Sequence, residues 1–193
     1  HGLRCVPEGQ VRAVLQLSHG MVEYIDRYRP LAEYLADRGI LVTGHDHLGH
    51  GASIRTKEDY GYFAEPDGNR AVLADLHAVT VLTKDLYPNL PYFLLGHSMG
   101  SFYARQYLCE YGRELNGAII MGTGFQPKAL VKVAKTLCRV LAAFHGWHYR
   151  SNLVANLSFM AYNKGLAQPR PVRGGQVSGR RALHLYLYAE RLL

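Results

Sequence analysis

The sequence predicts an α/β fold in which a mostly parallel sheet is flanked by helices. Short apolar runs of strand type alternate along the chain with amphipathic segments of helical spacing. One such run ends in the motif G-x-S-x-G, from Gly96 to Gly100, and a helical pattern follows it directly. At 193 residues the chain is long enough for one domain with a substantial core and short for two. The alternation favours a parallel sheet, because each helix returns the chain to the same edge.

The first predicted elements are a strand, a helix and a second strand. Residues 11–17 are rich in Val and Leu with partial alternation, which is typical of a buried strand. In residues 28–39, Pro30 suits a first helical turn and Gly39 ends the pattern. Residues 40–43 form a short apolar run that predicts another buried strand.

A polar loop rich in histidine follows the second predicted strand. His45, Asp46, His47 and His50 fall within six positions, a composition that raises the hypothesis of a metal site. The segment lacks the i, i+4 pairing of helical ligands, and no cysteine is placed to complete a tetrahedron. We therefore expect a structural loop and no metal.

The next elements continue the alternation. Residues 71–87 carry apolar side chains three to four positions apart, and Pro88 ends this predicted helix. Residues 92–95 form an apolar strand that runs into the G-x-S-x-G motif, and the helix after it extends to Tyr111, before Gly112. Residues 117–121 predict one more buried strand.

The G-x-S-x-G turn is the strongest chemical signal in the chain. A serine between a strand and a helix sits on a sharp, strained turn, and side chains two positions away would collide with neighbouring elements. Gly96 and Gly100 remove those side chains, so Ser98 is a candidate nucleophile. The helix that begins at Met99 directs its first N–H groups toward charge developing near Ser98. The weaker alternative is a glycine-rich turn with a bystander serine.

Three motifs in this order and at this spacing resemble one family. They are residues 18–24 (SHGMVEY), residues 44–53 (GHDHLGHGAS) and residues 96–100 (GHSMG). Over roughly residues 1–165 the chain resembles the monoacylglycerol lipase and lysophospholipase-like branch of the α/β-hydrolases. The resemblance implies an incomplete α/β-hydrolase fold, with the N-terminal part of the core in residues 1–125 and the start of a helical cap in residues 126–169.

The resemblance also implies site roles and a substrate class. It assigns the two oxyanion-hole donors to the backbone N–H groups of Met21 and Met99, with Gly20 allowing close approach of the substrate. It gives His19, His97 and Asp46 supporting roles, Asp46 acting with Ser53 as an internal anchor of its loop. The implied substrates are small lipid esters, monoacylglycerols or lysophospholipids, and no cofactor is implied.

The remaining members of a catalytic triad are not found in the sequence. In α/β-hydrolases the acid and then the base follow the serine along the chain. The acids after Ser98 are Glu110, Glu114 and Glu190, and the histidines are His145, His148 and His184, none of which follows a predicted strand and short loop. We therefore expect little or no turnover from these 193 residues alone. The alternatives are a non-catalytic module that binds acyl ligands and a nucleic-acid binder that uses the basic residues near the end of the chain.

The pattern of apolar and charged residues changes near Gln126. Apolar residues from Leu130 to Leu141 recur at helical spacing beside Lys128, Lys132 and Arg139, which predicts an amphipathic helix. The alternatives are a helix that covers the sheet and a cap helix that forms part of an acyl-chain groove. A basic face beside an apolar face also suits peripheral contact with a membrane surface.

The net charge of +7 comes from the end of the chain. Residues 150–193 contain seven Lys and Arg against Glu190 as the single acid, whereas residues 1–149 are nearly balanced. Residues 170–193 are rich in Arg and Gly and show no hydrophobic period, so we expect a non-native or disordered tail. A shift of reading frame after Pro169 would explain this change, and a native basic tail is the alternative. The charged residues are not interleaved with a stacking platform, so we expect no nucleic-acid partner.

Further expectations concern the cellular location of the protein and the state of its cysteines. No apolar run approaches the 18 residues of a membrane span, and no signal peptide is visible, so we expect a cytoplasmic protein whose start has been cut or processed. Three widely spaced cysteines suggest neither a disulfide framework nor a metal site. The oligomeric state, the acyl-chain length and the head group of the substrate stay open.

Overall fold

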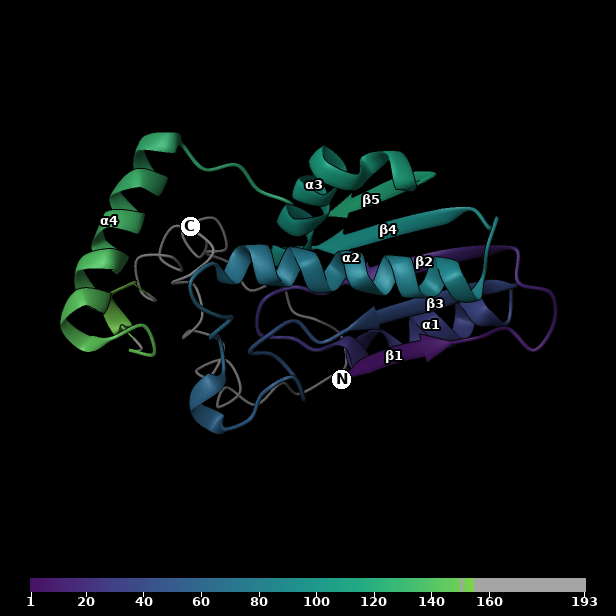
Figure 1. Ribbon diagram of the computed structural model, residues 1–193, viewed down its shortest axis with the longest axis horizontal. Helices are drawn as coiled ribbons and strands as arrows, with labels where there is room; N and C mark the ends of the chain where they lie inside the picture. Colours follow the sequence, from purple (N-terminus) through teal and green to yellow (C-terminus); the bar gives the residue numbers. More distant parts are fainter. Residues whose placement is uncertain (150, 155–193) are drawn as a thin grey trace, which may run out of the picture. The chain divides into compact units, whose positions relative to one another are not determined.

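The computed structural model describes residues 1–149 and 151–154. They fall into two compact units, His1–Phe125 and a second that begins at Gln126 (Figure 1). The first unit contains a five-stranded sheet in the order β1-β3-β2-β4-β5. β1 is antiparallel to β3, and the other neighbours are parallel, which confirms the predicted α/β class. The strands are β1 (Gly2–Cys5), β2 (Ala13–Ser18), β3 (Ile40–His45), β4 (Tyr92–His97) and β5 (Gly117–Met121).

The helices of the first unit lie in the gaps that the sequence predicts. They are α1 (Arg29–Ala36), α2 (Gly68–Leu86) and α3 (Met99–Tyr111), with short 3-10 helices at Ile25–Tyr28, Lys57–Asp59 and Gly112–Glu114. Pro30 lies in the first turn of α1, where its missing N–H removes no helical bond. Asp67 caps α2 by accepting a hydrogen bond from the backbone N–H of Arg70 at 3.1 Å.

One face of the sheet packs against α1 through an apolar cluster. Leu15 and Leu17 project from β2 toward this face and pack with Ile25 and Ala32, all of them buried. Val42 from β3 joins the same cluster, in register with Leu15. Successive residues of a strand point to opposite faces, so the residues between these must face α2 and α3.

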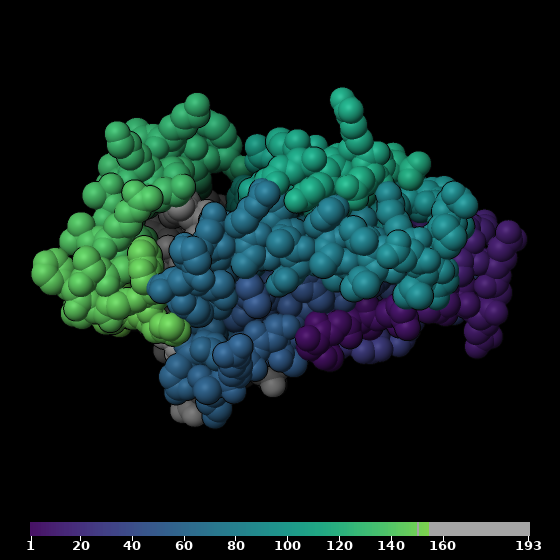
Figure 2. Space-filling model, viewed as in Figure 1, coloured from purple at the N-terminus to yellow at the C-terminus, as the bar shows by residue number. Residues whose placement is uncertain are grey.

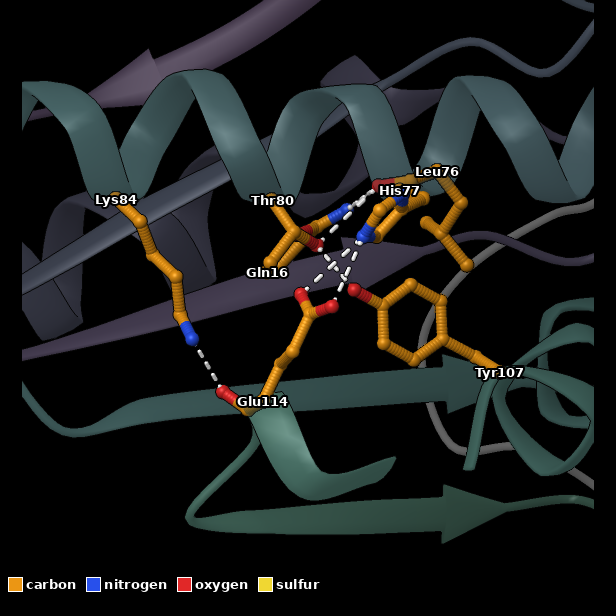
Figure 3. A network of polar contacts seen from close by, with 7 residues as sticks. All are labelled: Gln16, Leu76, His77, Thr80, Lys84, Tyr107 and Glu114. Carbon is orange, nitrogen blue, oxygen red and sulfur yellow. Dashed lines mark hydrogen bonds and ion pairs between the residues drawn. The ribbon is translucent and has the colours of Figure 1, made fainter. Parts of the chain in front are cut away.

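The opposite face is held by a buried polar network that starts at Gln16 of β2 (Figure 3). Its side-chain amide donates to the Leu76 carbonyl at 2.8 Å, and its Oε1 accepts from the Thr80 hydroxyl at 2.7 Å. The Tyr107 hydroxyl of α3 donates to Thr80 Oγ1 at 3.0 Å. These hydrogen bonds therefore join helix α2 to the sheet and to α3. Helix α2 forms much of the near surface in Figure 2.

Two features of the first unit differ from the prediction. Strand β1 has no counterpart among the predicted elements, because its four residues form too short a pattern and its place depends on pairing with β3. In this pairing Leu3, which is buried, lies opposite Gly44. The prediction that the strand at residues 117–121 is buried is wrong for the described residues. Strand β5 lies at the other edge of the described sheet, where Ile119 is 48% and Met121 47% exposed.

The second unit contains α4 (Lys128–His145), as the spacing after Gln126 predicts. Leu130, Val133 and Val140 of this helix are exposed. Among the residues that the structure describes, no helix is long and apolar enough to cross a membrane. The expected tail of residues 170–193 lies outside the described residues, as does the part of the expected cap after Val154.

Candidate active site

The candidate site lies where β2, β3 and β4 end, at the same edge of the sheet. Parallel register places Ser18 opposite Gly96 and Leu17 opposite Gly44, so the loops after the three strands meet there. Loops at the carboxyl ends of parallel strands are where α/β proteins build their binding sites. All three sequence motifs contribute to this edge.

Ser98 lies between the last residue of β4 and the first residue of α3 in a strained conformation. Its φ is 51° and its ψ is −115°, in a region that residues with a Cβ rarely adopt. Its backbone N–H donates to the Met121 carbonyl at 2.9 Å, and its carbonyl accepts from the Ser101 N–H at 2.9 Å. Bonds to β5 and to the first turn of α3 therefore hold the strained turn in place.

The two glycines of the motif sit at backbone contacts that leave no room for a side chain. A Cβ on Gly100 would lie 2.0 Å from the Ser18 carbonyl oxygen, and one on Gly96 would lie 2.3 Å from the Gly100 carbonyl oxygen. Both distances are far below van der Waals contact. The glycines thus let α3 approach the ends of β2 and β4 closely enough to form the turn.

The loop after β2 contacts the serine turn. A Cβ on Gly20 would lie 3.1 Å from the Cβ of Ser98, so this loop and the serine turn are adjacent. Met21 follows Gly20 and is half-buried, while Met99 is buried at the start of α3. The structure therefore brings together the segments that carry both expected oxyanion donors.

The carboxylate of Glu23 connects these two loops, and no role was assigned to it on sequence grounds. Its Oε1 accepts hydrogen bonds from the backbone N–H of Gly20 and from the Tyr28 hydroxyl, the latter at 2.9 Å. The same oxygen lies 2.9 Å from Nδ1 of His97, the residue before Ser98. Burial by itself would raise the pKa of Glu23, but these hydrogen bonds outweigh burial and hold that pKa below its usual value.

The loop after β3 packs beneath the loop after β2 through buried histidines. His47 donates its backbone N–H to Nε2 of His19 at 3.0 Å, and its own Nε2 lies 3.1 Å from the Ser18 hydroxyl. Burial lowers the pKa of His19 to about 4, and it lowers the pKa values of His45, His47 and His50 as well. These four histidines, which we call the histidine cluster, are therefore neutral at pH 7.

Asp46 anchors the same loop from within. Its Oδ1 accepts from the Ile25 N–H at 2.7 Å and its Oδ2 from the Ala52 N–H at 2.8 Å. Ser53 accepts a hydrogen bond from the N-terminal amine at 3.2 Å. In the described residues, no group of three or more His, Cys, Asp or Glu side chains is arranged to hold a metal ion.

The two acids that soon follow Ser98 in the sequence have other partners. Glu110 forms an ion pair with Arg70, and Glu114 lies 3.1 Å from Nε2 of His77, which stacks on Tyr111. Both acids belong to the far end of α3 or to the turn after it. Glu190 and His184 lie outside the described residues.

The sheet topology and the strained serine turn define the core of an α/β-hydrolase. The family model Hydrolase_4, described as "Serine aminopeptidase, S33", matches residues 9–184, and the chain belongs to this family. This match reaches residue 184 and so includes part of residues 170–193, for which we expect a non-native or disordered tail.

Several relatives are monoglyceride lipases. The human enzyme is 40% identical over 102 residues, which cover 49% of this chain and 29% of the human protein. The monoglyceride lipase homolog of Monkeypox virus is 39% identical over 113 residues, covering 57% and 38%, respectively. The chain thus spans between 29% and 38% of the length of the first relatives it matches.

Solved structures show the same fold. A carboxyl esterase of Bacillus coagulans superposes with a TM-score of 0.65 at 21% identity, over 96% of this chain and 66% of that one. A soluble variant of the monoglyceride lipase of Saccharomyces cerevisiae, in complex with a substrate analog, gives 0.57 at 25% identity, over 74% and 47%.

Proposed function

We propose that the chain is the N-terminal part of a serine ester hydrolase that acts on monoacylglycerols or lysophospholipids. The observation that carries the proposal is the strained conformation of Ser98 with Gly20 packed against it. A serine on such a turn can present its hydroxyl beside backbone N–H groups of the adjacent loops, which acyl transfer requires. The relatives named monoglyceride lipases support the lipid ester as substrate.

In the proposed reaction, the Ser98 hydroxyl oxygen attacks the carbonyl carbon of the ester. The electron pair of the C=O bond moves to oxygen, and the N–H groups of Met21 and Met99 donate to this oxyanion. Collapse of the tetrahedral intermediate breaks the ester C–O bond and releases the alcohol, leaving an acyl group on Ser98. Water then attacks the acyl carbonyl through a second tetrahedral intermediate and releases the fatty acid.

The proton of Ser98 needs a base, which in this fold passes it on to the leaving alcohol. We assign neither this base nor its partner acid to a residue of the chain. Loss of a triad member leaves a residual rate enhancement of about 10³–10⁴ over water, which the oxyanion hole and substrate binding supply. The chain itself is therefore proposed to be a weak hydrolase.

Covalent labelling tests the identity of the nucleophile. The purified chain is incubated with a fluorophosphonate, and the modified peptide is located by mass spectrometry. Slow labelling at Ser98, lost in Ser98→Ala and kept in Thr136→Ala at an exposed hydroxyl of α4, is the expected result. Labelling at any other residue would remove Ser98 from the proposal. Rapid turnover of p-nitrophenyl butyrate, abolished in Ser98→Ala, would show that the chain contains its own base.

Contact with a lipid surface is a second part of the proposal. Helix α4 carries exposed apolar side chains at Leu130 and Val133 beside Lys128 and Lys132. An apolar face flanked by lysines favours adsorption to anionic bilayers. Co-sedimentation with phosphatidylserine-containing vesicles, weakened in Val133→Glu and by 0.5 M NaCl, is the expected result. Equal recovery with and without vesicles would contradict it.

A further inference from the structure

The loop between β2 and α1 contains a second strained residue. Val22 has a φ of 59°, in the left-handed region where a β-branched side chain crowds its own backbone. Such a conformation costs free energy and persists only where the surrounding structure holds it. Val22 follows Met21 directly, so the strain lies within the turn that carries a proposed oxyanion donor.

Glu23 closes this turn. Its carboxylate accepts the backbone N–H of Gly20, three residues earlier, so that Met21 and Val22 lie inside a closed loop. Closure restricts the dihedral angles of the enclosed residues and thereby fixes the direction of the Met21 N–H. The Glu23 side chain is only 7% exposed, so water competes little for this bond.

The same carboxylate oxygen reaches the serine turn through His97. The His97 ring nitrogen Nδ1 lies 2.9 Å from Oε1 of Glu23, and His97 precedes Ser98. One oxygen therefore contacts the turn around Met21 and the strand end that precedes Ser98. Across this contact, a Cβ on Gly20 would lie 3.1 Å from the Cβ of Ser98.

We propose that Glu23 is a positioning residue for acyl transfer. Its carboxylate holds the strained turn at Val22 closed and fixes this turn against the serine turn. The Met21 and Met99 N–H groups then face one oxyanion. The inference rests on the proposed function for the identity of the reaction. The closure of the turn does not depend on that function and is measured separately.

The number of hydrogen bonds explains why a carboxylate is needed. Oε1 receives the Gly20 N–H, the Tyr28 hydroxyl and the His97 Nδ1, while Oε2 lies 3.2 Å from Arg27. A glutamine has the same shape, but one of its two terminal atoms is an NH₂ group that cannot accept. In Glu23→Gln the amide oxygen can take the place of Oε1 only if the NH₂ group faces the Arg27 guanidinium, from which it cannot accept. The uncharged oxygen also holds its three donors more weakly than a carboxylate does.

The test compares Glu23→Gln with the wild-type chain by amide hydrogen exchange and by ester hydrolysis. We expect the amides of residues 20–22 to exchange at least tenfold faster in the variant. We expect the residual kcat for p-nitrophenyl butyrate to fall tenfold or more with KM within twofold, because an oxyanion donor acts in the transition state. Glu33→Gln, at an exposed carboxylate of α1, is the matched control and should change neither quantity.

A second substitution separates positioning from general stability. Glycine adopts a φ near 60° without strain, so Val22→Gly removes the backbone strain that the hydrogen bond of Glu23 is proposed to counteract. Val22→Gly added to Glu23→Gln should therefore recover at least part of the lost kcat, which a merely structural role would not allow. If Glu23→Gln alone does not fold, the double variant is compared with Val22→Gly by exchange, and the amides of residues 20–22 must exchange faster in the double variant.

Equal exchange at residues 20–22 with and without the Glu23 carboxylate would overturn the inference. A wild-type chain that hydrolyses no ester and takes no fluorophosphonate would instead overturn the proposed function, and the exchange result would still decide on the closure of the turn. A parallel fall in kcat and rise in KM without recovery in Val22→Gly would show that Glu23 supports folding only.

Discussion

The backbone N–H of His47 donates to Nε2 of His19 at 3.0 Å, and this bond determines where His19 carries its proton. The other ring nitrogen, Nδ1, lies 2.7 Å from the Gly20 carbonyl oxygen and must donate to it. His19 is therefore neutral with its proton on Nδ1. A second proton on Nε2 would face the N–H of His47 and break the bond between the two loops.

Acid should therefore destabilise the protein through the histidine cluster. His19 lies 4.3 Å from His47 and 5.5 Å from His50 between ring centroids, and the buried Asp46 and Glu23 are the acids that face it. Burial depresses the pKa of His19 in the folded state to about 4, below the 6.5 of the unfolded chain. The unfolded state thus binds more protons between these values, so stability falls as the pH drops below 6.5.

We expect His19 alone to remove about 3 kcal/mol of the free energy of unfolding by pH 4. Urea unfolding at pH 7.5, 6.0 and 5.0 measures the effect, and the slope should be smaller in His19→Gln, with the remainder due to His45, His47 and His50. His145→Gln, at an exposed histidine of α4, should retain the slope. A free energy of unfolding that is constant from pH 7.5 to 5.0 would contradict the argument.

Gly100→Ala should prevent the serine turn from forming as it stands. The added Cβ would meet the Ser18 carbonyl at 2.0 Å, and neither backbone can move without disturbing β2 or α3. We expect a loss of at least 1–3 kcal/mol in thermal or urea unfolding. Gly112→Ala is the matched control, because its Cβ would meet only Leu108 at 3.7 Å and its φ is −59°. Equal stabilities of the two variants would contradict the packing argument.

The network around Gln16 predicts different costs for two conservative substitutions. Thr80→Val keeps the shape of the side chain but leaves the buried Tyr107 hydroxyl without its acceptor, at a cost of about 1–3 kcal/mol. Tyr107→Phe removes a donor, while Thr80 still bonds to Gln16, so about 1 kcal/mol is expected. Urea unfolding of both variants checks the order, and a larger loss for Tyr107→Phe would contradict it.

Asp46→Asn should destabilise the loop after β3 despite its similar size. Both carboxylate oxygens accept backbone N–H groups, from Ile25 and Ala52, and an amide must turn its NH₂ group toward one of them. We expect a cost of about 2 kcal/mol, since the group is buried and charged. Asp37→Asn, at an exposed residue just after α1, should cost less than 0.5 kcal/mol. A similar effect of the two substitutions would show that Asp46 is not an anchor.

Periodicity predicts the elements of the core because each has one apolar side. The predicted strand at residues 117–121 coincides with β5, and the predicted end of the helix at Tyr111 is the end of α3. Strand β1 escapes such a prediction because its four residues gain their conformation from pairing with β3.

The candidate site is predicted unevenly from sequence. Ser98, Gly96 and Gly100 are found from their spacing, because a tight strand–helix turn restricts residue types at fixed positions. Glu23 is not found in this way, because its position depends on the left-handed backbone of Val22, and no local preference predicts valine there. The acid that follows three residues after Gly20 is the only signal in the sequence.

The order of the strands also has a consequence for synthesis on the ribosome. Strand β2 lies at the centre of the described sheet, yet both of its neighbours, β3 and β4, follow it in the chain. Gly96, which is in register with Ser18, is synthesised much later than Ser18. Pairing across so long a separation is slow, and β2 must remain without its second neighbour until residue 97 has left the exit tunnel. The edge of β2 that pairs with β4 therefore presents unpaired backbone N–H and C=O groups for most of the translation of the first unit.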